Sequence, residues 1–393
     1  MGREDKVYRN RNFQIACSGS FMGMMTAAII IPAFPKMVQT FGITEQSIGL
    51  LISAYTLPAF IFAPLAGIIA DRLGRKRLLI PSFFLYGILG GSCALAPDFN
   101  TLLILRVFHG IAGAPLMSVS STIIGDIFSG QKRAEAMGLN TTVMYIGYII
   151  YPVLGGALAN FAWNYSFLPF LTALPLGIMA LIFLNSPEPR SEQSLRDYLG
   201  NALGYLKSLK VLWLFMVAVI TYILLYGAYL VYFSLLLGKR FHASPLTIGL
   251  FISALGLVTA ITSTQAGRLS RRLPVVRLII GSFIVYAIAM AIVPVMPSLW
   301  LLMVPTLLFG IAHGLNLPSQ RFIAASLTPL EHRAGFVAIY GTMVPLGMTI
   351  APLVMGLAFS LTSLNYTFFI AAAIAVIIPL MAVIIGTGKL LAD

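Results

Sequence analysis

The sequence predicts an all-α integral membrane protein, with twelve transmembrane helices in two pseudo-symmetric six-helix bundles. Three observations predict this fold class: an apolar composition, a series of long apolar stretches, and an internal repeat. Of the 393 residues, 59% are hydrophobic and only 9% are charged, whereas about a quarter of the residues of a soluble protein are charged. So few charges cannot cover a water-facing surface. This excludes a soluble enzyme, a disordered chain and a secreted disulfide scaffold.

The apolar stretches are long enough to cross a bilayer as helices. A transmembrane helix needs about 20 apolar residues to span the roughly 30 Å hydrocarbon core. The third and fourth stretches are separated only by a weak turn at Pro97 and Asp98. The expected spans are residues 13–35, 46–69, 78–96, 101–122, 137–160, 166–185, 211–236, 245–266, 276–296, 299–323, 335–359 and 365–387.

The basic residues are distributed unequally between the two sides of these helices. With the N-terminus in the cytoplasm, 21 of the 25 Lys and Arg residues fall on the cytoplasmic side, three fall outside, and Arg106 lies within a span. Such a bias orients a membrane protein by the positive-inside rule. We therefore expect a multi-pass protein of the cell (inner) membrane with both termini in the cytoplasm. The formal charge of +13 then reflects topology rather than nucleic-acid binding.

The internal repeat has a period of 200 residues. Over residues 41–80 and 241–280, 16 of 40 positions are identical without a gap, and the register persists to Gly147 and Gly347. Glycines and arginines in one fixed frame are not explained by shared apolar composition. The two halves are therefore parallel repeats, an arrangement that places a binding cavity at the interface of the halves.

Three segments follow from this repeat. We expect an N-terminal six-helix bundle over residues 1–185 and a C-terminal six-helix bundle over residues 211–393. Residues 186–210 form the only long polar connection, and their leucines recur at helical spacing. This pattern indicates a cytoplasmic linker that contains an amphipathic helix.

The loop after the second span carries the most specific motif. It reads Gly67-Ile-Ile-Ala-Asp71-Arg72-Leu-Gly74-Arg75-Lys-Arg. This motif resembles the loop signature of the major facilitator superfamily, and with the twelve-helix repeat the resemblance covers essentially the whole chain. The superfamily is one of transporters that work by alternating access.

The resemblance implies a conformational latch at this loop. In the superfamily the acid of the motif docks at the N-terminus of helix 11, here near Ala334, and the later arginine pairs with an acid at the inner end of helix 4. The glycine permits close helix approach. In the second half of this chain Arg271 replaces the acid, so we expect an asymmetric gate. The latch residues are Gly67, Asp71, Arg72, Gly74, Arg75 and Asp126.

Two further motifs resemble those of the twelve-helix drug:proton antiporters. Helix 4 contains Arg106 and, where that family has glutamine, His109. Helix 5 resembles the packing motif of exporters, whose small residues let helices 5 and 8 pack closely while proline bends the helix. Tyr151 stands where that motif has glycine and weakens the antiporter inference. The packing-motif residues are Gly147, Pro152, Gly155 and Gly156.

Arg106 has two interpretations. At about 1.5 Å rise per residue it lies roughly 7 Å below the outer surface, so its side chain could extend to that surface. Alternatively it is a cavity-lining cation that holds helix 1 or biases proton coupling.

The chain departs from the antiporter family in its acids. All twelve Asp and Glu residues lie in loops or at helix ends, and helix 1 has no carboxylate. The deep titratable side chains are His109 and His313, and histidine is the residue that changes charge near neutral pH. Packing is the alternative role for each. The candidates for proton coupling are therefore Arg106, His109 and His313.

A second set of residues is expected to line the substrate cavity. Tyr222, Tyr226 and Tyr229 lie on one face of helix 7 at α-helical spacing. Aromatic and methionine side chains suit bulky, variable ligands because they repack readily, and tyrosine adds a hydrogen-bonding hydroxyl. Helix-packing surfaces are the alternative interpretation. The other cavity candidates are Met22, Met25, Tyr145, Tyr148, Asn316 and Gln320.

The sequence thus favours a secondary active transporter that exports small amphiphilic or drug-like molecules, with protons as a candidate exchange ion. A sugar or metabolite exporter, an uncoupled facilitator, and a non-transporting receptor on the same scaffold remain alternatives. No HExxH metal pair and no GxxxxGKS phosphate loop occurs, so we expect neither an enzyme nor an ATP-driven pump. We expect a monomer in the lipid bilayer that binds a small-molecule substrate, without cofactor, metal or nucleic acid.

Overall fold

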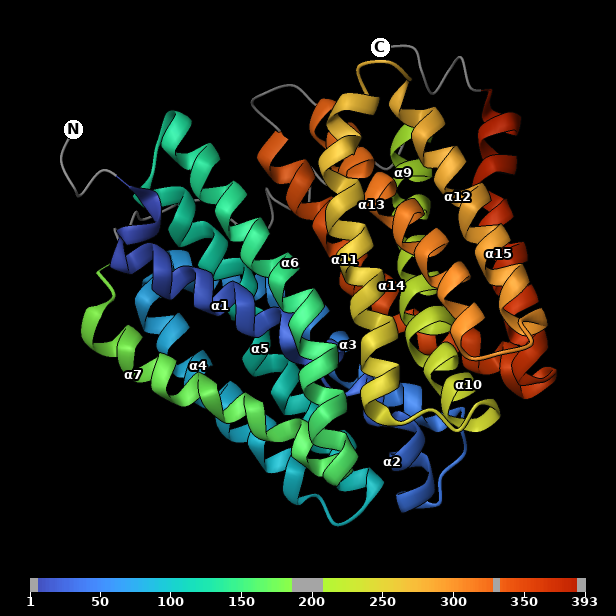
Figure 1. The fold of residues 1–393 in the computed structure, drawn as a ribbon. Coiled ribbons are helices and arrows are strands. Elements are labelled where there is room, and N and C mark those ends of the chain that lie inside the picture. The colour runs from blue at the N-terminus through green and yellow to red at the C-terminus, as the bar shows by residue number, and fades with distance from the viewer. Residues whose placement is uncertain (1–5, 186–207, 328–332, 387–393) are drawn as a thin grey trace. The chain divides into compact units, whose positions relative to one another are not determined.

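The computed structural model describes residues 6–185, 208–327 and 333–386, and every regular element in these ranges is helical (Figure 1). This follows from the bilayer, where backbone N–H and C=O groups find no water and must pair within their own segment. The elements are η1 (Val7–Arg9), α1 (Arg11–Ala28), η2 (Ile31–Ala33), α2 (Phe34–Phe41), η3 (Ser47–Gly49), α3 (Leu50–Leu73), α4 (Arg75–Ser92), η4 (Cys93–Leu95), α5 (Phe99–Ile127), α6 (Gly130–Phe161), η5 (Trp163–Thr172), α7 (Ala173–Phe183), α9 (Leu209–Tyr222), η6 (Ile223–Tyr232), α10 (Phe233–Arg240), α11 (Pro245–Leu269), α12 (Val275–Ile292), η7 (Val293–Val295), η8 (Trp300–Leu302), α13 (Met303–Ser326), α14 (Arg333–Leu361) and α15 (Leu364–Ile385).

Joined end to end, the described helices give twelve segments that are long and apolar enough to cross a membrane. The prediction of twelve helices is confirmed. The weak turn at Pro97 does separate two helices, because the Asp98 carboxylate accepts hydrogen bonds from the backbone N–H of Thr101 (2.9 Å) and from its hydroxyl (2.8 Å). These hydrogen bonds cap α5 and hold the pKa of Asp98 below its ordinary value.

The chain divides into two compact units. Unit 1 comprises Met1–Ile43 and Ala54–Glu192, and unit 2 comprises Thr44–Ser53 and Gln193–Asp393. The start of the second span therefore packs with the C-terminal helices, whereas the sequence placed it in the N-terminal bundle. The reason is local: Ser53 donates its hydroxyl to the carbonyl oxygen of Thr349 (2.8 Å). The predicted linker helix of residues 186–210 lies almost entirely outside the described residues.

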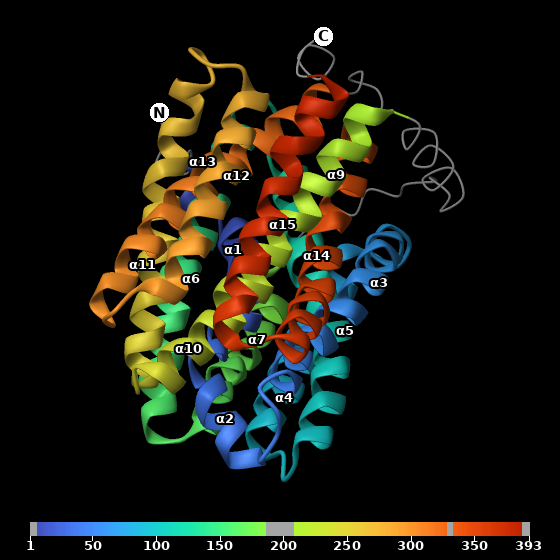
Figure 2. The same cartoon turned by 90° about the vertical axis from the view of Figure 1, so that its right-hand side faces the viewer.

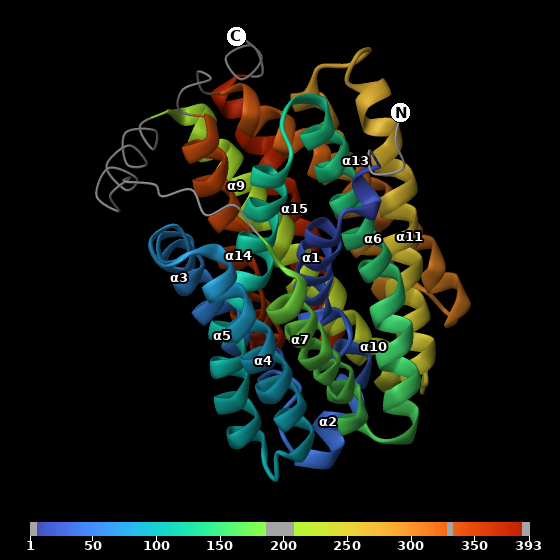
Figure 3. The ribbon, with the colours of Figure 1, turned by 90° about the vertical axis from the view of Figure 1, so that its left-hand side faces the viewer.

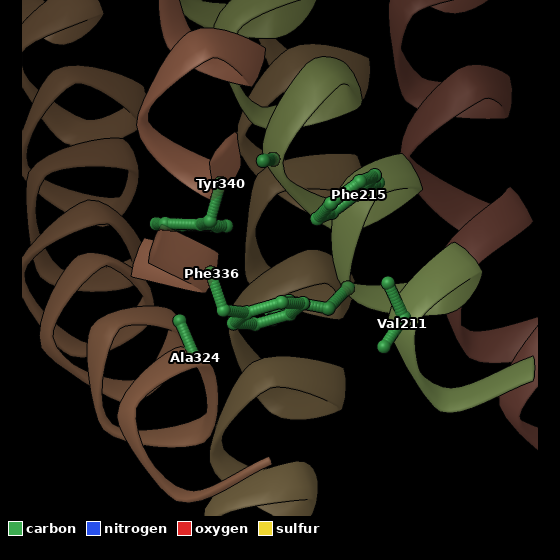
Figure 4. Packing of buried hydrophobic residues seen from close by; sticks show 7 residues of the cluster. Val211, Phe215, Ala324, Phe336 and Tyr340 are labelled. Atoms are coloured by element: carbon green, nitrogen blue, oxygen red, sulfur yellow. The ribbon is translucent and has the colours of Figure 1, made fainter. Parts of the chain in front are cut away.

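In unit 1, α4 packs against α5 and α7, and α1 packs against α5 and α6 (Figure 3). In unit 2, α13 packs against α11 and α12, and α15 packs against α12 and α9 (Figure 2). One apolar cluster of unit 2 joins α9, α13 and α14 (Figure 4). In that cluster the rings of Phe215 and Phe336 stack with centroids 6.1 Å apart.

Glycines at equivalent positions of the repeat make equivalent contacts in the two units. Gly110 of α5 lies against the carbonyl of Tyr55 in α3, and Gly310 of α13 lies against the carbonyl of Leu255 in α11, 3.1 Å from an ideal Cβ. Only a residue without Cβ lets two helix backbones approach this closely. The period of 200 residues therefore extends from sequence to packing.

The seventh span contains a wide-turned segment. Residues Ile223–Tyr232 form a π-helix between α9 and α10. Hydrogen bonds in a π-helix join residues five apart, and such segments are rare. Gly227 at its centre lies against Met355 and the carbonyl of Ala351 in α14, so there is no space for a side chain at this position.

We predict that Gly155→Ala destabilises the protein. A Cβ at this position of α6 would collide with the carbonyl oxygen of Ile29, and overpacking of this kind costs about 1–3 kcal/mol. The measurement is the midpoint of thermal unfolding in detergent, followed by a maleimide dye that reacts with the two buried thiols, Cys17 and Cys93.

Gly138→Ala is the matched control, because it lies in the same helix and its Cβ would meet no described atom within 4 Å. Its midpoint should stay equal or rise, since alanine is the better helix former. Equal midpoints for the two variants would contradict the packing argument.

Candidate functional site

The latch residues of unit 1 lie where α3 ends and α4 begins. Gly74 joins the two helices with a φ of 98°, which a residue with a side chain rarely adopts. Arg75 follows at once, and its guanidinium lies 3.6 Å from the Asp71 carboxylate and also contacts the Asp126 carboxylate. A third contact goes to the carbonyl oxygen of Thr122 (3.4 Å). One buried arginine therefore ties the start of α4 to the ends of α3 and α5.

The other latch residues lie on less enclosed positions. Gly67 lies on a partly exposed stretch of α3, and no described atom lies within 4 Å of an ideal Cβ there. The expected close helix approach at Gly67 stays a prediction. Arg72 is exposed. The expected docking of Asp71 near Ala334 joins the two units and stays a prediction.

Arg106 is fully buried in unit 1. The alternative in which it extends to the membrane surface is therefore wrong. Its Nη2 donates to the carbonyl oxygen of Thr26 (3.2 Å), its Nη1 donates to Nδ1 of His109 (3.1 Å), and its guanidinium carbon lies 4.7 Å from the centre of the Tyr55 ring. A guanidinium over a tyrosine ring gains a cation–π attraction. We call Thr26, Tyr55, Tyr86, Arg106 and His109 the Arg106 cluster.

The Thr26 carbonyl is available because α1 ends early. In a continued α-helix the N–H of Ile30 would bond to it, but here that N–H bonds to Ala27 (3.2 Å). Pro32 lies in the tight turn that follows, Ile31–Ala33, and proline cannot continue the hydrogen-bond ladder. The break in helix 1 thus supplies the acceptor that holds Arg106.

Tyr86 connects the cluster to α4. Its hydroxyl donates to the carbonyl oxygen of Met22 (2.7 Å) and lies 3.2 Å from the hydroxyl of Thr26. Its ring packs on His109 with centroids 4.3 Å apart. Helices α1, α3, α4 and α5 therefore meet at one buried polar cluster.

Unit 2 contains a second buried polar group. His313, Asn316 and Gln320 lie on one face of α13 because their spacing of three and four residues matches the helical turn. The Tyr286 hydroxyl lies 2.7 Å from Nδ1 of His313 and 3.4 Å from Nδ2 of Asn316. Tyr340 of α14 donates its hydroxyl to Oε1 of Gln320 (2.9 Å).

Thr221 of α9 is the centre of this group. Its hydroxyl accepts from Nδ2 of Asn316 (2.9 Å) and Nε2 of Gln320 (3.0 Å), and donates to the carbonyl oxygen of Val217 (2.7 Å). We call Thr221, Tyr286, His313, Asn316, Gln320 and Tyr340 the Asn316 network. It joins four helices, α9, α12, α13 and α14.

The three tyrosines of helix 7 do not share one face. Tyr222 and Tyr226 are neighbours, with ring centroids 6.2 Å apart, but Tyr229 donates to the hydroxyl of Thr306 (2.8 Å) and stacks on Phe309. The prediction assumed an α-helix, whereas the π-helix from Ile223 changes the angle between successive residues. Tyr229 therefore packs inside unit 2.

The remaining candidates lie on α1 and α6. Met22 and Met25 are buried inside unit 1, whereas Tyr145 and Tyr148 are half-buried on α6. Gly147 lies against the ring of Phe21, and Gly155 lies against Ile29, so the small residues of this motif face helix 1. Pro152 is buried in α6, and Gly156 is buried as well. A role in the substrate cavity stays a prediction for all four cavity candidates.

Sequence reasoning overlooked Tyr55, Tyr86, Thr221, Tyr286 and Tyr340. The repeat could have identified one pair, because Tyr86 and Tyr286 are 200 residues apart and occupy equivalent positions. In each unit this tyrosine contacts a histidine. The other three carry no comparable signal, since isolated hydroxyls in apolar helices are common.

A cavity of about 270 Å³ in unit 1 opens between α1 and α7, and is lined by Arg11, Gln14, Ser18 and four apolar side chains. It contains none of the predicted site residues. In the described part of the chain, no three His, Cys, Asp or Glu side chains lie close enough together to hold a metal ion.

Comparisons with known proteins agree on one family. A family model described as Major Facilitator Superfamily matches residues 16–239 and 217–387. Multidrug resistance protein 2 of Bacillus subtilis is 25% identical over 93% of this chain and 92% of its own length. Quinolone resistance protein NorA of Staphylococcus aureus is 23% identical over 89% of this chain and 90% of its own length.

Solved structures show the same fold. A bacterial homologue of the human lysosomal transporter Spinster, in an inward-facing and unoccupied conformation, is similar with a TM-score of 0.78 and 18% identity over 100% of this chain and 98% of that one. The nucleoside transporter NupG has a TM-score of 0.78 and 15% identity over 94% of this chain and 98% of that one.

We predict that Thr221→Val destabilises the protein. The change keeps the shape but removes the oxygen that accepts from two buried amides, and each lost hydrogen bond costs about 0.6 to 3 kcal/mol. The measurement is the midpoint of thermal unfolding in detergent.

Thr142→Val is the matched control for this change. Thr142 also donates its hydroxyl to a carbonyl one turn back in its helix, Gly138, but it is exposed. A decrease of equal size in both variants would show that the amides do not depend on the Thr221 hydroxyl.

Proposed function

Because the chain belongs to the Major Facilitator Superfamily, and its members carry small molecules across membranes, we propose that this transporter exports small amphiphilic, drug-like molecules in exchange for protons. The observation that carries the proposal is the similarity, over nine-tenths of the chain, to relatives named for multidrug and quinolone resistance. Export then proceeds by alternating access, with the binding site exposed to one membrane face at a time.

The chemistry of the buried groups supports an amphiphilic substrate. The Arg106 cluster and the Asn316 network offer aromatic rings, hydroxyls and amides, and the described acids lie at or near helix ends. Aromatic surfaces with a few hydrogen-bonding groups recognise lipophilic molecules that carry a polar group. Among the residues of these two groups only Arg106 carries a charge, so they supply no carboxylate for a substrate with several positive charges.

The latch supports alternating access. Arg75 holds the ends of α3 and α5 to α4 through two carboxylates. The Asp71 carboxylate is partly exposed, so its pair with Arg75 breaks at modest cost because water replaces it. In unit 2, Lys239 bonds to Glu45 (2.6 Å) just before the second span begins. We propose that the protein acts as a monomer in the plasma membrane. We place its termini and the latch on the cytoplasmic side, because 21 of 25 basic residues lie there in that orientation.

Transport in liposomes tests the proposed function. We predict that purified protein with pyranine inside the vesicles moves ethidium and a fluoroquinolone, but not D-xylose, and that each transported molecule drives proton movement in the opposite direction. Empty vesicles measure leakage.

Other outcomes contradict the proposal in distinct ways. Transport of D-xylose alone would indicate a sugar exporter. Equilibration of ethidium without proton movement would indicate an uncoupled facilitator, and no transport of any compound would contradict the substrate class.

We predict that Asp71→Asn weakens the latch. Loss of a partly exposed charge pair costs about 1 kcal/mol, which changes the ratio of inward-facing to outward-facing protein about fivefold. The measurement is the maleimide reactivity of single cysteines introduced on each membrane face. Asp98→Asn is the matched control, because asparagine also caps a helix. An unchanged ratio and rate in Asp71→Asn would overturn the latch.

A further inference from the structure

The two buried histidines differ in the group that faces Nδ1. In unit 1 it is the guanidinium of Arg106, 3.1 Å away, and in unit 2 it is the hydroxyl of Tyr286, 2.7 Å away. We propose that His313 is the proton-binding residue of this transporter and that His109 is a positioning residue for Arg106. The proposal rests on the proposed exchange of substrate for protons, and it names the site where the proton binds.

His109 is confined to one protonation state by its partner. A guanidinium donates hydrogen bonds and accepts none, so Nδ1 of His109 accepts and its proton lies on Nε2. A second proton on Nδ1 would point directly at the N–H of Arg106. Nε2 has no hydrogen-bond partner in the described part of the chain and lies against Gly90. His109 therefore serves to orient Arg106 and has no partner for a second proton.

His313 has a partner that can reverse its role. A tyrosine hydroxyl donates one hydrogen bond and accepts others. When His313 is neutral, the hydroxyl of Tyr286 donates to Nδ1. When Nδ1 carries a proton, the same 2.7 Å contact persists with Nδ1 as donor and the tyrosine oxygen as acceptor. No movement of either ring is needed.

Asn316 supplies the acceptor that this reversal requires. Asn316 is fully buried, and its Oδ1 has no hydrogen-bond partner among the residues that the structure describes. A buried acceptor without a donor lowers the stability of the folded protein by about 1–3 kcal/mol, so a function for this oxygen would explain its presence. Its Nδ2 lies 3.4 Å from the Tyr286 hydroxyl. Rotation of the amide brings Oδ1 to this hydroxyl and gives up the hydrogen bond from Nδ2 to Thr221. The hydroxyl proton stays on Tyr286 and then points to Oδ1 of Asn316 instead of to His313.

One proton enters, one N–H bond forms at Nδ1 of His313, and the hydroxyl proton of Tyr286 turns from His313 to Oδ1 of Asn316 without leaving its oxygen. Release reverses each step. The site gains one positive charge, which a buried apolar environment disfavours, so the protonated form favours a conformation that admits water.

The surroundings of His313 contain no carboxylate among the described residues of the packed helices. The titratable and charged groups on those elements are Tyr286 and Arg277 of α12, Arg321 of α13 itself, Arg268 of α11, Lys210 and Tyr222 of α9, Tyr226, Tyr229 and Tyr232 of η6, and Tyr340 of α14. Of these, Tyr286 bonds to His313 directly, and Tyr340 joins through Gln320 and Thr221. His313 is thus connected by hydrogen bonds to Thr221 of α9 and to Tyr340 of α14.

Histidine NMR tests the protonation order without any substrate. The full chain is labelled with ¹⁵N-histidine in lipid nanodiscs, and its four histidines are assigned with single His→Gln variants. Between pH 9 and pH 4 we expect His313 to gain a second proton at a higher pH than His109. The proposal is overturned if His109 gains it first, or if His313 stays neutral throughout.

Transport tests the coupling. In vesicles with an interior one pH unit more acidic than the medium, one-for-one exchange of ethidium for protons accumulates ethidium up to about tenfold. We expect His313→Gln to equilibrate ethidium without accumulation, because glutamine still bonds to Tyr286 but binds no proton. Tyr286→Phe should lose accumulation as well. His242→Asn is the control, since His242 is exposed with a φ of 50° that asparagine also adopts.

The outcomes separate the two proposals. If wild-type protein transports none of the compounds, the proposed function fails and the NMR order still decides the protonation site. If wild-type protein accumulates ethidium and His313→Gln does so equally, the assignment of His313 fails and the proposed function stands. Thermal midpoints of the variants show that lost accumulation does not come from unfolding.

Discussion

The absence of water in the hydrocarbon core is the constraint on which the rest of this structure depends. Backbone N–H and C=O groups must find their partners within the protein, so a break in regular helix geometry leaves a backbone group that another residue has to hydrogen-bond. The early end of α1 leaves the Thr26 carbonyl, and Arg106 bonds to it. A charge deep in an apolar unit is thus positioned by a proline in a neighbouring helix, and the two features depend on each other.

The sequence predicted the helices well and their faces poorly, for one physical reason. Length and hydropathy report the crossing of a bilayer, and charged residues such as Arg75 report the membrane edge. Lipid is as apolar as a helix interface, so an apolar pattern does not show which side of a helix faces a neighbour. Tyr229 was therefore misplaced by an unrecognised π-helix, and the contacts of Tyr55 and Thr221 left no trace in the sequence.

The two repeats keep their packing but have diverged in chemistry. The equivalent residues Tyr86 and Tyr286 pack against rings at equivalent positions of the next span, His109 at 4.3 Å and Phe309 at 4.5 Å. Phenylalanine thus occupies in unit 2 the place of histidine in unit 1, and His313 lies one turn further along. This displacement exchanges an arginine partner for a tyrosine partner, so a shift of one helical turn separates the positioning role proposed for His109 from the proton-binding role proposed for His313.

The first and seventh spans are equivalent in the repeat and nearly equal in residue number, 31 and 32. They differ in winding, because one contains a tight 3₁₀ turn at Ile31–Ala33 and the other a wide π segment at Ile223–Tyr232. A 3₁₀ turn rises about 2.0 Å per residue against 1.5 Å in an α-helix, whereas a π turn rises less. Nearly equal numbers of residues therefore reach unequal lengths in these two spans. The two repeats share one sequence pattern, but the first helix of each is wound differently.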